Sequence, residues 1–294
     1  MKEPARPLTV GEWCAEYERI IRALPLKQIT INNRINYIRH IRLSLSNKRL
    51  TDVEPLDLIL ILRGLENAGK PYMRRRVRIE AIQLFNEGII ARKTNFNPAA
   101  AISFWKTRPA RSRLTLEHWQ AIHAWARNTN MAWFALALEL ALVSSQRRAD
   151  LVRLGYSDVV GHHLRVCQQK TGRRIALPLD LYLEKANLQL GSVLERLAKC
   201  GAPGITLLRR KDGKGYCPGH LSNTFKEGLR ACFPGKDWGE KRKPPSFHEI
   251  RSLSERLYRQ QGVDTMTLLG HSRQSMTDEY NDDRGLEEWK VLKI

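Results

Sequence analysis

Hydrophobic residues recur at helical spacing through the first ninety residues of the chain. The predicted helices cover residues 9–24, 29–45, 56–68 and 71–87. The second of them has the clearest apolar face, formed by Ile31, Ile35, Ile38 and Leu45. We therefore predict an all-α N-terminal domain over residues 1–90.

After residue 90 the pattern changes twice. Residues 91–113 contain Asn, Pro and a run of basic residues, which predicts a linker. Beyond it, residues 131–144 are almost wholly apolar but too short to cross a bilayer, so they predict a buried helix. Segments 163–166 and 173–178 predict a β-hairpin. Further helices are expected around 115, 181–199, 219–232, 245–262 and 263–269, with a short strand at 289–294. The second domain, 114–294 with a C-terminal tail at 285–294, is therefore mixed α+β.

The charge of the chain is far from balanced. Fifty Lys and Arg stand against thirty Asp and Glu, which gives a formal net charge of +20. Residues 1–110 carry 20 basic and 10 acidic side chains, and residues 111–294 carry 30 and 20, so each part contributes +10. Such a distribution predicts a polyanion that contacts both domains, with nucleic acid as the leading partner. A membrane surface is disfavoured because no basic amphipathic segment has a Trp- and Leu-rich opposite face.

Several basic residues are candidates for contacts with DNA phosphates. The predicted fourth helix carries a dense run of arginines with no acidic residue among them. Repulsion between like charges makes such a run unfavourable on a face that only contacts water, so contacts with phosphates explain it better. The candidates are Arg34, Arg74, Arg75 and Arg78 on the N-terminal helices, and Lys106, Arg108 and Arg111 in the linker. For any single residue of the linker, a plain exposed connector is nearly as good an interpretation.

The cysteines predict neither a disulfide framework nor a zinc site. Their number is five, and no Cys-x-x-Cys occurs. His248-Glu249-Ile250-Arg251 is not the His-Glu-x-x-His of a zinc helix, so no metal is expected. The N-terminus lacks the apolar core of a signal peptide, which favours a cytoplasmic protein.

Candidate chemistry lies in five places of the second domain. These are Gln146–Leu151, Gln169–Gly172, Phe247–Arg251, Leu268–His271 and Tyr280. Alone, each has an ordinary interpretation: Arg147 can pair with Asp150, Lys170 is a turn lysine, and a tyrosine such as Tyr280 more often packs than reacts.

Taken in order, Arg, Lys, His-x-x-Arg, Gly-His and Tyr resemble the tyrosine recombinases. The sequence Tyr280-Asn281-Asp282-Asp283-Arg284-Gly285 is similar to the corresponding sequence in lambda-type phage integrases. The resemblance covers roughly residues 8–294 and is most specific over 114–294. It implies a SAM-like four-helix core-binding domain followed by a DNA breaking–rejoining catalytic domain. The implied catalytic set is Arg147, Lys170, His248, Arg251, His271 and Tyr280.

The resemblance also implies a role for each residue. Tyr280 attacks phosphorus and forms a 3′-phosphotyrosine, so neither ATP nor a cofactor is needed. Two guanidiniums, Arg147 and Arg251, bind the nonbridging oxygens with help from His271. Lys170 protonates the leaving 5′-oxygen, and His248 assists proton transfer at the tyrosine. Asp150 is expected to orient Arg147 or a histidine, and a simple acid at a helix start is an equally good interpretation.

The chain departs from the family pattern near its first arginine. Ser144-Ser145-Gln146 stands where Thr-Gly-x is usual, and Ala149 stands where glycine is frequent. The additional N-terminal domain that lambda-type integrases use for arm-type sites is expected to be absent.

The expected function is a prophage or genomic-island integrase in a bacterial host, associated with the nucleoid. Its partners would be double-stranded attachment sites, three further copies in a tetramer on two duplexes, and possible excision and host DNA-bending factors. A neighbouring copy would receive the C-terminal tail. Three alternatives remain: a chromosome-dimer resolvase, a type IB topoisomerase, and a catalytically silent DNA-binding regulator.

Overall fold

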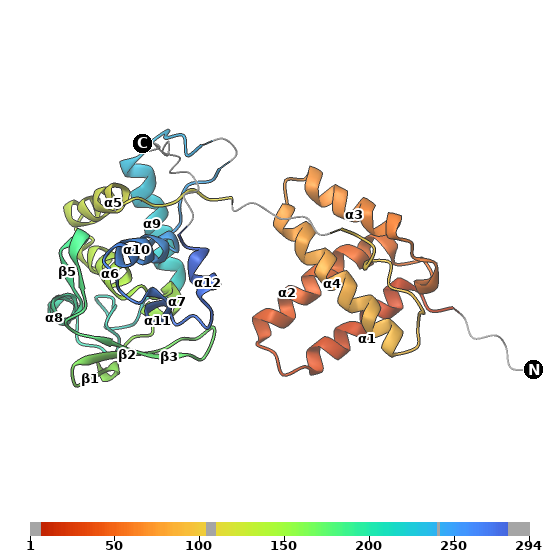
Figure 1. The fold of residues 1–294 in the computed structure, drawn as a ribbon, viewed down its shortest axis with the longest axis horizontal. Helices are drawn as coiled ribbons and strands as arrows, with labels where there is room; N and C mark the ends of the chain where they lie inside the picture. The colour runs from red at the N-terminus through yellow and green to blue at the C-terminus, as the bar shows by residue number, and fades with distance from the viewer. Residues whose placement is uncertain (1–6, 104–109, 240–241, 282–294) are drawn as a thin grey trace, which may run out of the picture. The chain divides into compact units, whose positions relative to one another are not determined.

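The computed structural model describes residues 7–103, 110–239 and 242–281. The chain forms two compact units, Met1–Pro109 and Ala110–Ile294 (Figure 1). The predicted strand at 289–294, and the basic residues Lys106 and Arg108, lie outside the described residues.

In its described residues the first unit contains four α-helices, as the hydrophobic pattern predicts, and a short 3-10 helix at Leu50–Asp52. Thr9 caps the first helix by accepting a hydrogen bond from the Glu12 backbone N–H, and the Glu12 carboxylate accepts one from the Thr9 N–H in return. Proline occupies the first turn of the third and fourth helices. Trp13 and Ile38 lie in their shared core. The helices are α1 (Val10–Ala23), α2 (Gln28–Leu45), α3 (Pro55–Asn67) and α4 (Pro71–Ile90).

The chain that follows α4 turns back onto the same unit. Asn97 donates hydrogen bonds to the Ile82 carbonyl at 3.0 Å and to the Asn86 side chain at 2.6 Å. Ile102 is buried, and its carbonyl accepts a hydrogen bond from Arg78 Nε at 2.8 Å. The first part of the segment predicted as a linker is therefore held against α4.

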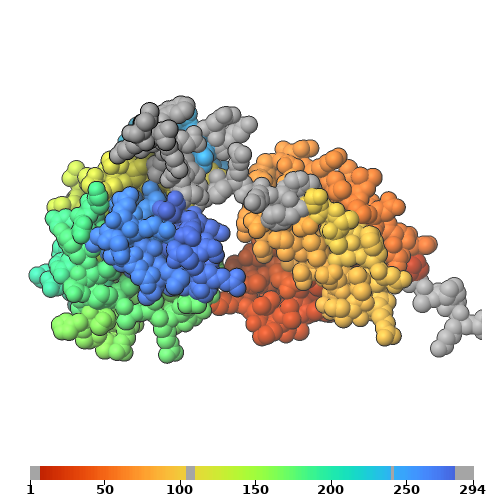
Figure 2. All heavy atoms as spheres, viewed as in Figure 1, coloured from red at the N-terminus to blue at the C-terminus, as the bar shows by residue number. Residues whose placement is uncertain are grey.

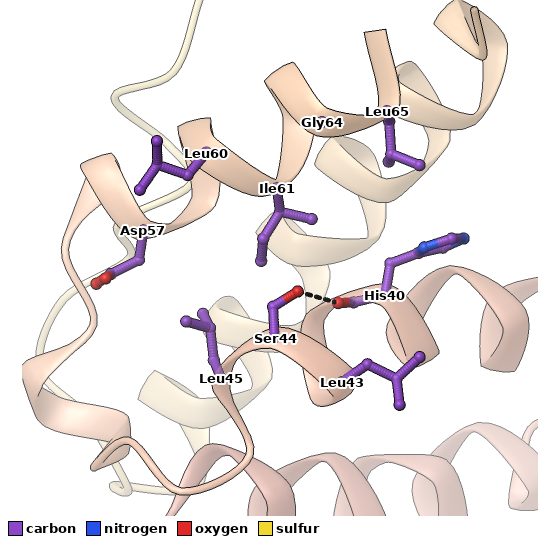
Figure 3. Close-up of a pocket in the computed structure, with 9 residues that line it drawn as sticks. All are labelled: His40, Leu43, Ser44, Leu45, Asp57, Leu60, Ile61, Gly64 and Leu65. Atoms are coloured by element: carbon purple, nitrogen blue, oxygen red, sulfur yellow. Dashed lines mark hydrogen bonds between the residues drawn. The ribbon is translucent and has the colours of Figure 1, made fainter. Parts of the chain in front are cut away.

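A largely apolar groove of about 480 Å³ lies between α2 and α3 (Figure 3). Leucine side chains from both helices face it, and Ser44 turns its hydroxyl to the His40 carbonyl of its own helix. Its lining residues are His40, Leu43, Ser44, Leu45, Asp57, Leu60, Ile61, Gly64 and Leu65. None of the predicted catalytic residues is among them.

The second unit is organised around α6 (Ala132–Ser144), whose residues from Phe134 onward are all buried. Helices α5 (Leu116–Asn128), α8 (Leu190–Lys199) and α10 (Glu249–Gln260) pack against it (Figure 1). The prediction of a buried helix is confirmed. In the part of the chain that the structure describes, no helix is long and apolar enough to cross a membrane.

One further long helix, α9 (Pro218–Cys232), and several short elements belong to the described part of the second unit. The short elements include α7 (Arg148–Leu151), α11 (Thr265–Leu269), α12 (Gln274–Asp278) and an antiparallel sheet β1 (Val159–Val160), β2 (His163–Cys167), β3 (Arg174–Pro178). The predicted hairpin is confirmed as β2–β3, with Leu164 opposite Leu177.

One predicted helix is partly wrong. Residues 181–189 form a small hairpin, β4 (Tyr182–Leu183) with β5 (Leu188–Gln189), and only then does α8 begin. Asn187 adopts a left-handed conformation with φ 51°, and its side chain accepts a hydrogen bond from the Tyr182 hydroxyl at 2.7 Å. This local turn outweighs the helical periodicity of the apolar residues.

Candidate active site

The predicted catalytic residues come together on one face of the second unit. The first turn of α10, the β2–β3 turn, the segment between α6 and α7, and the residues around α11 and α12 all contribute. In Figure 2 the blue atoms of the C-terminal segment and the green atoms of the hairpin are exposed on a common face of this unit. Motifs that lie far apart in the sequence therefore contribute to one region of the second unit.

Tyr280 lies among the histidines and arginines of its own chain. Its ring centroid is 6.1 Å from that of His248 and 5.5 Å from that of His271. The Arg251 guanidinium carbon is 5.9 Å from the Tyr280 ring centroid. The tyrosine backbone is anchored as well, because Ser252 Oγ donates to the Tyr280 carbonyl at 2.9 Å.

Arg251 is buried in the first turn of α10, with 1% of its surface exposed. It donates hydrogen bonds to the carbonyls of Ser145 and Leu269 and lies 3.4 Å from His271 Nε2. Burial, followed by the positive charge of Arg147, lowers its pKa to about 10. Arg251 therefore remains charged at neutral pH. A buried positive charge next to a second arginine is stabilised when an anion binds beside it.

Arg147 is half-buried at the start of α7, where its backbone is still extended. The turn before it contains Ser145 at φ 60°, in the left-handed region that glycine adopts without strain. This is the position where the sequence departs from the family pattern. The Ser145 hydroxyl is buried and has no hydrogen-bond partner among the described residues.

We therefore expect Ser145→Gly to stabilise the protein by about 1 kcal/mol, because it relieves a left-handed non-glycine backbone and removes a buried, unpaired hydroxyl. Thermal unfolding would show this as a melting temperature higher by roughly 2–4 °C. Ser144→Gly is the matched control. Ser144 is the last residue of α6 and donates to the Leu140 carbonyl, so its loss should lower the melting temperature. Destabilisation by Ser145→Gly would contradict the strain argument.

Lys170 is exposed in the turn between β2 and β3, which is closed by Gly172 at φ 71°. Asp150 helps to fix this turn, because its carboxylate accepts a hydrogen bond from the Gln169 backbone N–H at 2.7 Å. Asp150 was expected to orient Arg147 or a histidine. The described residues instead show it bonded to the hairpin that carries Lys170.

Both histidines of the site are held neutral in the free protein. Desolvation, followed by the charges of Arg251 and Arg147, lowers the pKa of each of His248 and His271 to about 4. His271 is buried, and its Nδ1 lies 3.0 Å from the Thr277 hydroxyl. His248 as a whole residue is exposed to solvent, and besides desolvation the cations around it lower its pKa.

This lowered pKa predicts a loss of stability in mild acid. Between pH 6.5 and about 4 the unfolded chain binds a proton at His271 that the folded chain does not, so acid favours unfolding. The free energy of unfolding should fall as pH drops through this window, with His271 contributing up to about 1.4 kcal/mol per pH unit. Denaturant titrations at several pH values would measure the slope. His271→Gln should flatten it, and an unchanged slope would refute the assignment.

The candidate DNA contacts divide into two groups. Arg34 donates to Glu80 at 2.9 Å and to the Tyr17 hydroxyl at 2.7 Å, Arg74 forms an ion pair with Glu66, and Arg78 bonds the Ile102 carbonyl. These three arginines form hydrogen bonds or ion pairs within the first unit. On α4, successive residues of the helix point in different directions, so only part of its arginine run faces solvent. Arg75 and Arg111 are exposed to solvent, and Arg111 also donates a hydrogen bond to the Pro244 carbonyl at 2.8 Å.

Sequence reasoning missed the residues that support the site. Gln168 binds Arg147 at 2.7 Å, Thr277 contacts His271, and Ser252 anchors Tyr280. Arg113, buried at the start of the second unit, donates to Glu249 and to the Glu279 carbonyl beside Tyr280. Ser252 directly follows the predicted His248–Arg251 motif in the sequence. The other three lack a motif of their own.

The chain is similar to known proteins over most of its length. Residues 112–285 match the model of the phage integrase family. The chain is 33% identical to the integrase of Escherichia phage lambda and 34% to that of Enterobacteria phage 434, covering 98% of this chain and 79% of each relative. A lambda integrase dimer bound to a COC′ core site superposes with a TM-score of 0.90 at 32% identity, covering 98% of this chain and all of that one. A lambda integrase tetramer bound to a Holliday junction also gives 0.90, at 30% identity, over 99% of this chain and 84% of the other. The chain belongs to the phage integrase family of tyrosine recombinases.

Proposed function

We propose that this site-specific recombinase integrates or excises a prophage or genomic island by cutting and rejoining DNA through Tyr280. The observation that carries the proposal is the cluster of Arg147, Lys170 and Arg251 around a tyrosine anchored in its own site. These cations repel one another in the free protein, and a phosphodiester between them relieves that repulsion. The site is therefore arranged in advance for the negative charge that develops during phosphoryl transfer.

Each step of the reaction has a group to serve it. Tyr280 Oη attacks phosphorus and loses its proton, which the neutral imidazole of His248 accepts. Arg147 and Arg251 bind the nonbridging oxygens, with His271 beside them. As the bond from phosphorus to the 5′-oxygen breaks, Lys170 donates a proton to that oxygen. Attack by a 5′-hydroxyl of another strand reverses the same step, so the energy of the phosphodiester is retained.

The DNA partners are proposed from the relatives. Lambda integrase has been solved as a dimer on a core site and as a tetramer on a Holliday junction. We propose that this chain binds double-stranded attachment sites and assembles as a tetramer on two duplexes. Residues 1–90 would bind the core-type site, 91–113 would connect the domains, 114–294 would carry the chemistry, and the tail 285–294 would reach a neighbouring copy.

Binding should weaken steeply with salt, because Lys and Arg side chains that contact phosphates release counterions. For about six contacts, raising salt from 50 to 200 mM should reduce affinity on the order of 10³-fold. Arg75→Ala and Arg111→Ala should each lower the slope of log affinity against log salt by about one. Fluorescence anisotropy with a labelled core site would measure this. If neither substitution changes the slope, these two residues do not contact DNA phosphates.

The proposal is tested with supercoiled plasmids. One plasmid carries a pair of candidate attachment sites, and a second lacks them. A recombinase gives rearranged products from the first and leaves the second supercoiled. Relaxation of both plasmids would indicate a type IB topoisomerase, and specific binding with no strand exchange and no covalent complex would indicate a silent regulator.

A further inference from the structure

One buried side chain links several parts of the active site. Gln168 follows β2 and lies between two exposed neighbours, yet it has no exposed surface. Its backbone closes the turn that carries Lys170: the Gln168 N–H donates to the Arg173 carbonyl at 2.8 Å, and its carbonyl accepts from the Gly172 N–H at 2.8 Å. The position of this side chain is therefore set by the hairpin.

The amide of Gln168 uses its full hydrogen-bonding capacity. Oε1 accepts hydrogen bonds from Arg147 at 2.7 Å and from the Thr171 hydroxyl at 3.0 Å. Nε2 donates to Gln146 Oε1 at 3.1 Å and to the Leu269 carbonyl at 2.9 Å. A primary amide offers two donors and two acceptor sites, so all are satisfied and the amide cannot flip without placing N–H against the Arg147 donor.

These bonds join segments that carry different catalytic groups. Oε1 holds the guanidinium of Arg147, and the turn bearing Lys170 supplies Gln168 itself. Nε2 holds the carbonyl of Leu269, which also accepts a hydrogen bond from Arg251 and lies two residues before His271. A displacement of the glutamine would therefore be transmitted to the arginines, the lysine and the histidine together.

Gly270 fits the same arrangement. It adopts φ 62°, and a Cβ built on it would lie 2.9 Å from Gln168 Nε2. The glycine before His271 is thus needed both for its backbone conformation and for the close approach of this amide.

We propose that Gln168 is a positioning residue that holds Arg147 in the geometry for cleavage and couples the Lys170 hairpin to the segment of His271. The inference rests on the proposed function. Gln168→Met keeps the length of the side chain and removes its hydrogen bonds. Since a misplacement near 1 Å costs about 100-fold, we expect a single-turnover cleavage rate lower by about that factor. Gln189→Met, at an exposed site in β5, is the matched control and should cleave like the wild type.

The test uses the full chain on a nicked suicide substrate, with a second substrate whose scissile phosphate is a methylphosphonate. The methyl group removes the negative charge that Arg147 would bind, so a defect that acts through Arg147 shrinks on this substrate. Gln168→Met and Arg147→Ala should both show that rescue, and adding Gln168→Met to Arg147→Ala should slow cleavage less than threefold. Gln168→Glu, which keeps the acceptors and loses the donors, should be slowed if the bond to Leu269 matters.

The outcomes separate the two proposals. If the wild type forms no covalent complex, the recombinase function fails. If the wild type cleaves and Gln168→Met cleaves equally fast, or its defect is the same on both substrates and multiplies with that of Arg147→Ala, Gln168 has only a structural role and the inference is overturned. Specific DNA binding and the melting temperature, measured on each variant, identify a variant that has not folded. If Gln168→Met has not folded, the cleavage rates of Gln168→Glu and the wild type on the two substrates decide whether Gln168 acts through Arg147.

Discussion

Tyr280→Phe is expected to abolish covalent attachment to DNA while leaving DNA binding intact. The substitution removes one hydroxyl and leaves the ring between His248 and His271. Its backbone anchors remain, because Ser252 and Arg113 bind the carbonyls of residues 280 and 279. Removal of a catalytic nucleophile lowers the rate on the order of 10⁴-fold or more. Cleavage should therefore fall below detection without a change in melting temperature.

The measurement uses a nicked suicide substrate, from which the short cleaved strand escapes so that the phosphotyrosine accumulates. Products are separated on a denaturing gel. Wild type should give a protein band shifted by DNA, and Tyr280→Phe should not. Tyr182→Phe is the matched control, since it removes an exposed hydroxyl bonded to Asn187 outside the site. A band that persists in Tyr280→Phe would show that another residue is the nucleophile.

The candidate catalytic set could be picked out from the sequence because its residues stand in a fixed order in the chain. Arg147, Lys170, the His248–Arg251 motif, His271 and Tyr280 need no knowledge of contacts to be recognised together. The helices were predictable for a different reason, since burial of one face leaves a period in the sequence, as on α2. The buried helix α6 was predictable because its segment is almost wholly apolar and too short to cross a bilayer.

The supporting residues could not be predicted in this way. Gln168 differs from the exposed Gln169 only in the direction of its side chain, and nothing in their shared residue type records that direction. Asp150 lies one turn from Arg147 in sequence, yet it bonds the Gln169 backbone across the site. The arginines of α4 look alike in sequence, and only the packed helices separate Arg74 and Arg78 from the exposed Arg75. Hydrogen bonds between distant segments leave no local pattern.

Arg113→Met is expected to produce the largest loss of stability. The Arg113 side chain is 1% exposed, and it donates to the buried Glu249 carboxylate at 3.0 Å and to the Glu279 carbonyl at 2.8 Å. Methionine fills similar space but leaves the carboxylate buried without its cation. Breaking a buried ion pair in this way costs about 3–5 kcal/mol. In a unit of this size the melting temperature should fall by roughly 10 °C.

The same arginine bridges the two sides of the site, because Glu249 follows His248 and Glu279 precedes Tyr280. A double variant separates stability from positioning. Arg113→Met with Glu249→Met removes both buried charges, so it should regain part of the lost stability. Its cleavage should stay slow, because the Glu279 carbonyl still lacks the Arg113 bond that helps hold the tyrosine segment. Recovery of both stability and cleavage would limit Arg113 to a structural role. Unchanged melting of the single variant would refute the ion-pair argument itself.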